Sequence, residues 1–207
     1  MQKKRLAAVI PVQLQPEPTN FDSDVRMKGR VWLSKKGLSP TSPPPKGTKF
    51  PPYWSTTNRQ LWDAYSRTCS YLSIYFEFAT GASSTDHFIA KSANAGLAYE
   101  WSNYRLSCLG PNRIKNNFAD VLDPIGLLPE TFHWSPANGA IAPNPTLPPE
   151  QKRLARLTIK RLRLDSLENR EMRLGLFDEY ISGNISNQHL KRSCPFVWYE
   201  ANRQGLL

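Results

Sequence analysis

A short run near the middle of the chain, residues 84–117, sets an Asp-His pair, an Asn and an Asn-x-x-Lys group in order. Asp86 and His87 follow a turn rich in Ser and Thr and open a short apolar-polar alternation, which predicts the start of a strand. Neighbouring residues of a strand point to opposite faces. The two side chains can share a site only where the strand ends or kinks, and we expect this at His87.

The residue types in this run suit hydrolytic chemistry. A carboxylate is a hard oxygen ligand for Mg²⁺ or Mn²⁺, and a neutral imidazole can take a proton from water at physiological pH. Residues 101–103, after a Gly-containing loop, predict the start of a helix. The Gly110-Pro111 pair predicts a break just before Asn112 and Lys115, which lie about one turn apart if that part is helical.

The order of these elements, DHF, K-S, W-S-N, C and N-x-x-K, resembles the HNH (ββα-metal) endonuclease family, in the variant whose third signature residue is Asn. The resemblance implies that Asp86 binds a divalent metal ion and that His87 is the general base that activates water. Asn103 would hold the connecting loop against the His87 strand, and Asn112 would be the second metal ligand. The basic residues nearby would contact nucleic-acid phosphates: Lys91, Arg105, Arg113 and Lys115.

A looser similarity covers the surrounding segment. Residues 98–106 (AYEWSNYRL) and the upstream Cys69-x-Tyr71 resemble HNH proteins found beside ATPases in Septu-type bacterial anti-phage systems. This similarity implies a role as a defence effector and an ATPase subunit as a partner, while DNA is the substrate expected of an HNH endonuclease and RNA remains the alternative.

Many HNH relatives also hold a structural zinc ion with paired Cys-x-x-Cys knuckles. Here Leu72 and Pro111 stand where the second cysteine of each pair would be, so half the thiolates are missing. Because a closed zinc site normally needs four ligands, we expect no structural zinc. Cys69, Leu72 and Cys108 should instead pack as apolar residues.

Composition limits the remaining choices. The 207 residues, 40% of them hydrophobic, suffice for one ordinary core, and the net charge of +10 favours a polyanionic partner such as DNA. The alternative is a basic protein whose charge only keeps it in solution. Three cysteines make no disulfide framework, which favours the cytoplasm. The run Leu6–Ile10 is too short for a signal peptide and is stopped by Pro11, so we expect neither secretion nor a membrane span.

These patterns predict an α+β fold, mainly helical, in three parts. Residues 1–57 would form an extended, Pro-rich basic arm that either follows a phosphate backbone or packs on the core. Residues 58–124 would form the ββα-metal hairpin-helix core, and residues 125–207 a surface loop and helices packed on that core.

Several elements are specific enough to test. We expect a strand at residues 25–33, a helix over 58–75, and a first hairpin strand at 74–78 that turns into the His87 strand. Further helices are expected over 150–164 and from 165 to 183, and the apolar segment 195–199 should dock on the core or on a partner. Six cations on the first of these helices suit a phosphate backbone, or alternatively a membrane surface.

The function expected from these features is metal-dependent hydrolysis of DNA phosphodiester bonds. The alternative is a non-catalytic nucleic-acid-binding or scaffold subunit that keeps a degenerate nuclease fold.

Overall fold

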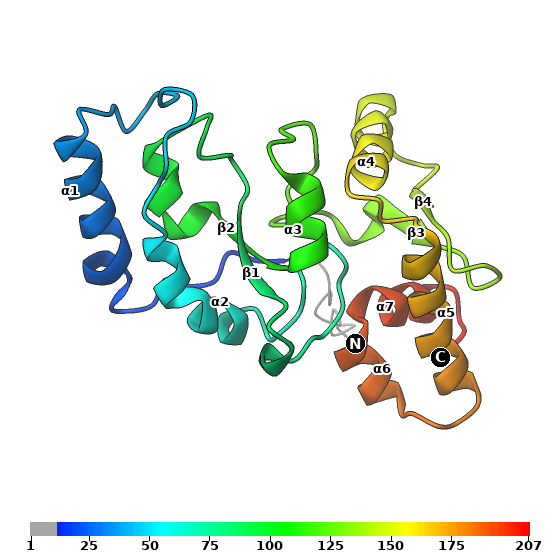
Figure 1. Cartoon of the computed structure of the whole chain (residues 1–207). Coiled ribbons are helices and arrows are strands. Elements are labelled where there is room, and N and C mark those ends of the chain that lie inside the picture. Colours follow the sequence, from blue (N-terminus) through cyan, green and yellow to red (C-terminus); the bar gives the residue numbers. More distant parts are fainter. Residues whose placement is uncertain (1–11) are drawn as a thin grey trace, which may run out of the picture. The chain divides into compact units, whose positions relative to one another are not determined.

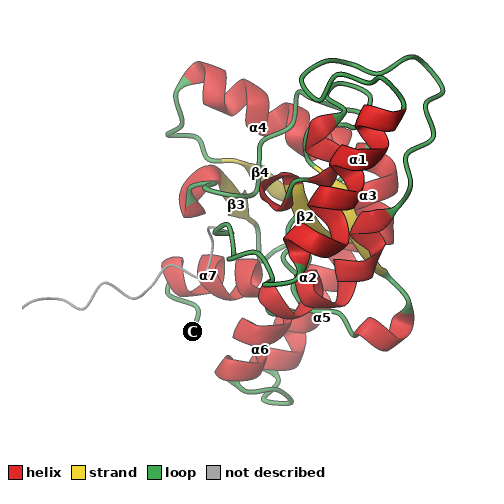
Figure 2. Ribbon diagram, turned by 90° about the vertical axis from the view of Figure 1, so that its left-hand side faces the viewer, coloured by secondary structure: helices red, strands yellow, loops and turns green. Residues whose placement is uncertain are grey.

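The computed structural model describes residues 12–207 and shows an α+β protein (Figure 1). Figure 2 shows that helices and loops dominate and that the strands are short. The run Leu6–Ile10, on which the expectation about secretion rested, lies outside the described residues. Within them, no helix is both long enough and apolar enough to cross a membrane. The elements are α1 (Met27–Lys35), α2 (Asn58–Ala64), β1 (Ser83–His87), β2 (Tyr104–Cys108), α3 (Leu109–Lys115), β3 (Phe132–Trp134), β4 (Ile141–Pro143), α4 (Pro149–Arg161), α5 (Leu167–Ile181), α6 (Asn187–Ser193) and α7 (Pro195–Arg203).

The chain forms two compact units. One, here called the β1–β2 unit, consists of residues 14–70 and 76–119; the other, the C-terminal unit, includes residues 71–75 and 120–207. The expected boundary between an arm and a core at residue 57 therefore falls inside the β1–β2 unit, because the arm packs with the strands.

Two antiparallel strands and a helix form the centre of the β1–β2 unit. β1 pairs with β2 in a register that sets Asp86 opposite Arg105 and His87 opposite Tyr104. α3 follows β2 without a loop and packs on both strands, while α2 packs on β1. The strands are thus covered, and this unit contains the largest fully buried side chains of the described residues: Trp62, Tyr99, Tyr104, Phe21, Lys115, Leu61 and Leu106.

The strand partners differ from those expected. Residues 74–78 form no strand, and Phe78 begins a 3₁₀ turn, Phe78–Thr80, that ends at Gly81 with φ of 67°. The partner of β1 is β2, which begins right after the single 3₁₀ turn Trp101–Asn103, where a helix was expected. The first four residues of β2 are buried, although its sequence, YRLSC, alternates apolar and polar residues as a half-buried strand does.

The segment expected as a strand at residues 25–33 is helical. A π-helical turn, Asp22–Arg26, continues into α1. Phe21, Val25 and Leu33 are buried on one helical face, at spacings of four and eight residues. Gly29 completes that face: a Cβ atom there would lie 2.2 Å from the Tyr99 ring, so only glycine permits this close approach.

The Pro-rich arm lies extended over the loop that joins β1 to β2. Gly96 N–H donates to Pro40 O at 2.9 Å and Ala95 N–H donates to Ser42 O at 3.2 Å. Further along, Tyr99 Oη donates to Pro51 O at 3.1 Å. These bonds hold both ends of residues 43–50 in place. The part of the expected arm without regular secondary structure is residues 38–52, whereas residues 22–35 are helical.

The helix expected over residues 58–75 ends at Ala64. Ser66 and Arg67 adopt left-handed backbone conformations, with φ of 52° and 63°, which stops the helix before Cys69 and Leu72. Cys69 is fully buried, and its Sγ accepts a hydrogen bond from Cys108 N–H at 3.4 Å. These two thiols pack in one place, whereas Leu72 belongs to the C-terminal unit.

The C-terminal unit contains the expected helices. α4 and α5 lie where the sequence predicted them, although Ser166 caps α5 while the Asp165 side chain accepts from Ile141 N–H at 2.9 Å. α7 buries Phe196 and Val197, as expected for the apolar segment 195–199. The segment 125–149 was expected to be a loop, but it contains the short antiparallel pair β3–β4.

Candidate functional site

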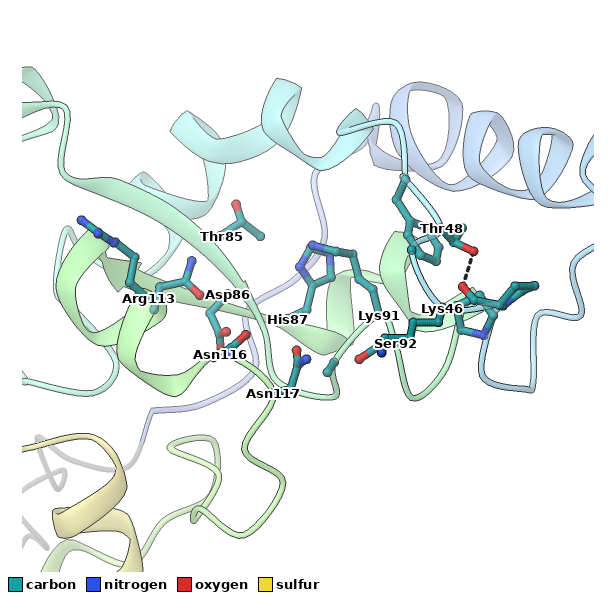
Figure 3. Close-up of a pocket in the computed structure, with 16 residues that line it drawn as sticks. Lys46, Thr48, Thr85, Asp86, His87, Lys91, Ser92, Arg113, Asn116 and Asn117 are labelled. Atoms are coloured by element: carbon teal, nitrogen blue, oxygen red, sulfur yellow. Dashed lines mark hydrogen bonds between the residues drawn. The ribbon is translucent and has the colours of Figure 1, made fainter.

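A cavity of about 670 Å³ lies beside the end of β1, within the β1–β2 unit (Figure 3). Three segments line it: the end of β1 with the residues that follow, the helix α3 with the residues after it, and the arm. The lining residues are Pro44, Pro45, Lys46, Gly47, Thr48, Phe50, Thr85, Asp86, His87, Ala90, Lys91, Ser92, Asn112, Arg113, Asn116 and Asn117.

His87 is the last residue of β1, and its imidazole is held from several sides. Its ring lies edge-to-face against Trp54, with centroids 4.7 Å apart, and against Tyr104 at 5.1 Å. Nε2 lies 3.0 Å from Ala98 O. Because a carbonyl oxygen only accepts, Nε2 carries the proton, and Nδ1 is left as the proton acceptor.

Burial, the largest cause, and the positive charges of Lys91 and Lys115 together lower the pKa of His87 to about 3. The bond to Ala98 opposes this shift but is the weaker influence. The imidazole is therefore neutral, the form that accepts a proton, throughout the physiological range.

This shift predicts an acid-dependent loss of stability. Below pH 6.5 the imidazole of the unfolded chain takes up a proton, whereas that of the folded chain does so only near pH 3. The free energy of unfolding should therefore fall by up to about 1.4 kcal/mol per pH unit between pH 6 and pH 4 on account of this residue. Urea unfolding across this range measures how steeply the free energy of unfolding depends on pH. In His87→Gln this slope should correspond to about one fewer proton taken up on unfolding; equal slopes in the two proteins would contradict the assignment.

Asp86 is buried, and its carboxylate faces a buried lysine. Lys115 Nζ lies 3.3 Å from Asp86 Oδ1 and 3.2 Å from Oδ2, and it also donates to the backbone oxygens of His87 at 3.1 Å and Phe88 at 3.0 Å. Lys115 is completely buried. The expectation that Lys115 contacts phosphate is therefore wrong: its ammonium fixes the end of β1 from inside.

Asn103 fastens the loop between β1 and β2 to the residues after His87. Its Oδ1 accepts from Ile89 N–H at 2.8 Å, and its Nδ2 donates to Ile89 O at 3.0 Å and to Leu97 O at 2.9 Å. Its backbone oxygen accepts from Phe88 N–H at 2.9 Å. Since Leu97 lies next to Ala98, these bonds also place the carbonyl that orients His87.

Asn112 projects from α3 into the lining of the same cavity as Asp86 and His87. Its Nδ2 donates to Ser84 Oγ on β1. The side-chain oxygen is therefore the Asn112 atom left to receive a cation. The structure thus brings to one cavity the three residues that the sequence proposed as ligands and base.

Of the expected phosphate contacts, Lys91 and Arg113 line the cavity and Arg105 does not. Lys91 Nζ lies 4.4 Å from the centroid of the Trp54 ring, and burial lowers its pKa. Arg113 is exposed on α3. Arg105 is 4% exposed and donates to Ser102 O and Tyr104 O, so its assignment to phosphate is wrong: β2 is covered by other elements at this point.

Two parts of the site were not anticipated. Trp54 packs on both His87 and Lys91, and residues 44–50 of the arm line the cavity. The arm was expected to contact nucleic acid through scattered cations, yet no spacing in the sequence connects residue 50 or 54 to residue 87. Only the alternation of cations and aromatics in the arm pointed toward a ligand.

Neither a scan of the chain against protein-family models nor a search among curated proteins gives a match.

Proposed function

We propose that this protein is a metal-dependent endonuclease of the HNH type that hydrolyses phosphodiester bonds of DNA. One observation carries the proposal: a neutral imidazole, with Nε2 hydrogen-bonded to Ala98 O and Nδ1 left as acceptor, lines the same cavity as the Asp86 carboxylate, the Asn112 carboxamide and three basic side chains. The hairpin of β1 and β2 followed by α3 has the order of elements that the HNH resemblance implies.

The oxygens of Asp86 and Asn112 fit a hard divalent cation such as Mg²⁺ or Mn²⁺. A cation held there would neutralise charge on the phosphate and stabilise the leaving 3′ oxygen.

In this proposal His87 acts as the general base. Nδ1 accepts the proton of the attacking water, a contribution of roughly 10²–10⁴ in rate. The Lys91 charge lowers the pKa of His87, so a phosphate bound at Lys91 would offset that charge and make the imidazole a stronger base when substrate is present. Trp54, Tyr104 and Ala98 O position the ring.

The basic side chains have separate tasks. Lys91 and Arg113 line the cavity and would receive the phosphates. Lys115 instead binds Asp86 and the backbone oxygens of His87 and Phe88. It would therefore position Asp86 and would not contact the substrate.

A second candidate function rests on this same ion pair. Lys115 already supplies a positive charge to both oxygens of Asp86, which is also what a site that has lost its cation would show. The protein would then be a nucleic-acid-binding or scaffold subunit that keeps a degenerate nuclease fold. Either protein could serve beside an ATPase in an anti-phage system, and co-purification with such an ATPase tests that role.

The ligand assignment makes a direct prediction. Purified wild-type chain should cleave supercoiled and linear DNA in Mg²⁺ or Mn²⁺ and should lose that activity in chelator. Asn112→Ala should raise the metal concentration for half-maximal cleavage by about tenfold, because it removes one of two protein oxygens. Asn202→Ala, the same change at an exposed position on α7, is the control. An unchanged metal requirement would show that another residue holds the ion, and cleavage that survives chelator would contradict the metal dependence.

A further inference from the structure

The cavity has two chemically different sides. Toward β1 and α3 it is polar and charged, with Asp86, His87, Lys91 and Arg113. Toward the arm the apolar lining residues are Pro44, Pro45 and Phe50, next to Lys46, Gly47 and Thr48. A nucleotide has the same division, because its phosphate is charged and its base is flat and largely apolar on its faces.

The arm side of the cavity is held rigidly. The Phe50 ring packs against Trp32, with centroids 5.4 Å apart, and against Tyr99 at 6.2 Å. Thr48 N–H and Thr48 Oγ1 both donate to Pro45 O, at 3.2 Å and 2.6 Å, which closes the turn before Phe50. Any side chain at Gly96 would come within 2.3 Å of Pro40 O, so the neighbouring loop fits the arm closely. The wall is therefore built before any ligand binds.

The size and lining of the cavity discriminate between substrates. Its volume of about 670 Å³ lies within the roughly 300–1,000 Å³ of sites that enclose one small ligand. In an intact duplex the faces of the bases are stacked on each other and only their edges are accessible in the grooves. A single strand exposes the faces, on which aromatic side chains stack.

We propose that this cavity accepts one unpaired nucleotide of a single-stranded nucleic acid, with its base against Phe50 and the Pro44–Pro45 side and its phosphate toward His87 and Lys91. The inference rests on the proposed nuclease function and names its substrate class. Figure 3 shows Lys46 at one end of the cavity and Arg113 at the other, with His87 and Lys91 between them. These end cations suit the phosphates before and after the bound nucleotide.

Binding measured without cleavage tests the inference. The full chain carrying His87→Ala is titrated, in chelator and at physiological salt, against a fluorescently labelled single-stranded DNA and its duplex. We expect the single strand to bind at least tenfold tighter. Adding Phe50→Leu should weaken single-strand binding about tenfold and leave duplex binding unchanged, because it removes the stacking face but keeps the apolar bulk. Phe50→Trp keeps the ring and should keep the affinity.

Equal or tighter duplex binding would overturn the inference, as would an unchanged single-strand affinity in folded Phe50→Leu. A second measurement needs no change at Phe50: a single strand with 5-iodouracil is photocrosslinked to the His87→Ala chain. Attachment within residues 44–54 supports the inference, and attachment only elsewhere overturns it. Single-strand preference without cleavage by the wild type would refute the nuclease proposal alone, whereas cleavage confined to duplex would refute this inference alone.

Discussion

His87→Ala should lower the rate of metal-dependent DNA cleavage by at least about 10²-fold, the lower end of what a positioned general base contributes. The change removes Nδ1, the proton acceptor of the imidazole, whose other nitrogen is committed to Ala98 O. Nucleic-acid binding should persist, since Lys91 and Arg113 remain. Time courses of plasmid cleavage in Mg²⁺ or Mn²⁺, together with fluorescence-anisotropy binding, measure both effects.

The control for this variant is His189→Ala. His189 is exposed on α6 in the C-terminal unit, so the same side chain is removed at a position outside the cavity. Its cleavage rate should match the wild type. Full activity in His87→Ala would remove His87 from the mechanism, and a loss of binding along with cleavage would indicate that the substitution disrupts the fold.

Lys115→Met should lower the free energy of unfolding by about 3–5 kcal/mol at neutral pH. The substitution keeps most of the side-chain volume but leaves the carboxylate of Asp86 buried without its cation, and it removes the donor to the backbone oxygens of His87 and Phe88. Chemical denaturation in chelator measures the change without a contribution from metal binding.

Two further variants are compared with Lys115→Met. Lys28→Met breaks an ion pair of 3.7 Å with Asp24, in which both side chains are well exposed, and should cost less than about 1 kcal/mol. Asp86→Asn combined with Lys115→Met removes both charges and should recover part of the loss. If Lys115→Met proved as mild as Lys28→Met, the buried ion pair would not be the element that fixes the end of β1.

Local patterns in the sequence were sufficient to find the centre of the site. Asp86 and His87 are adjacent, and the Asn-x-x-Lys group lies on α3 with Asn112 on the cavity side. The spacing of Asn112 and Lys115 gave their separation along a helix. It could not give the direction of Lys115, because that depends on which face of α3 packs against β1.

Contacts between distant residues explain what was missed. The apolar and polar residues of β2 alternate, which is typical of a strand, but the Trp-Ser-Asn signature just before it was interpreted as the start of a helix. Residues 25–33 were expected to form a strand, to which their β-branched residues are suited. The burial of Phe21, Val25 and Leu33 on one face, and the close approach of Gly29 to Tyr99, stabilise a helix instead. The wall of the cavity at Phe50 depends on hydrogen bonds from the backbone of residues 95 and 96 and from the Tyr99 hydroxyl to the arm, which no local pattern encodes.

The most direct test of the proposed chemistry is the fate of the attacking oxygen. A DNA oligonucleotide is cleaved by the wild-type chain in H₂¹⁸O with Mg²⁺ or Mn²⁺, under single-turnover conditions, and the product ends are analysed by mass spectrometry. Attack by water at the phosphorus with departure of the 3′ oxygen predicts a 5′-phosphate that carries one ¹⁸O atom and a free 3′ hydroxyl. An uncleaved oligonucleotide, a 3′-phosphate end or an unlabelled phosphate would contradict the account.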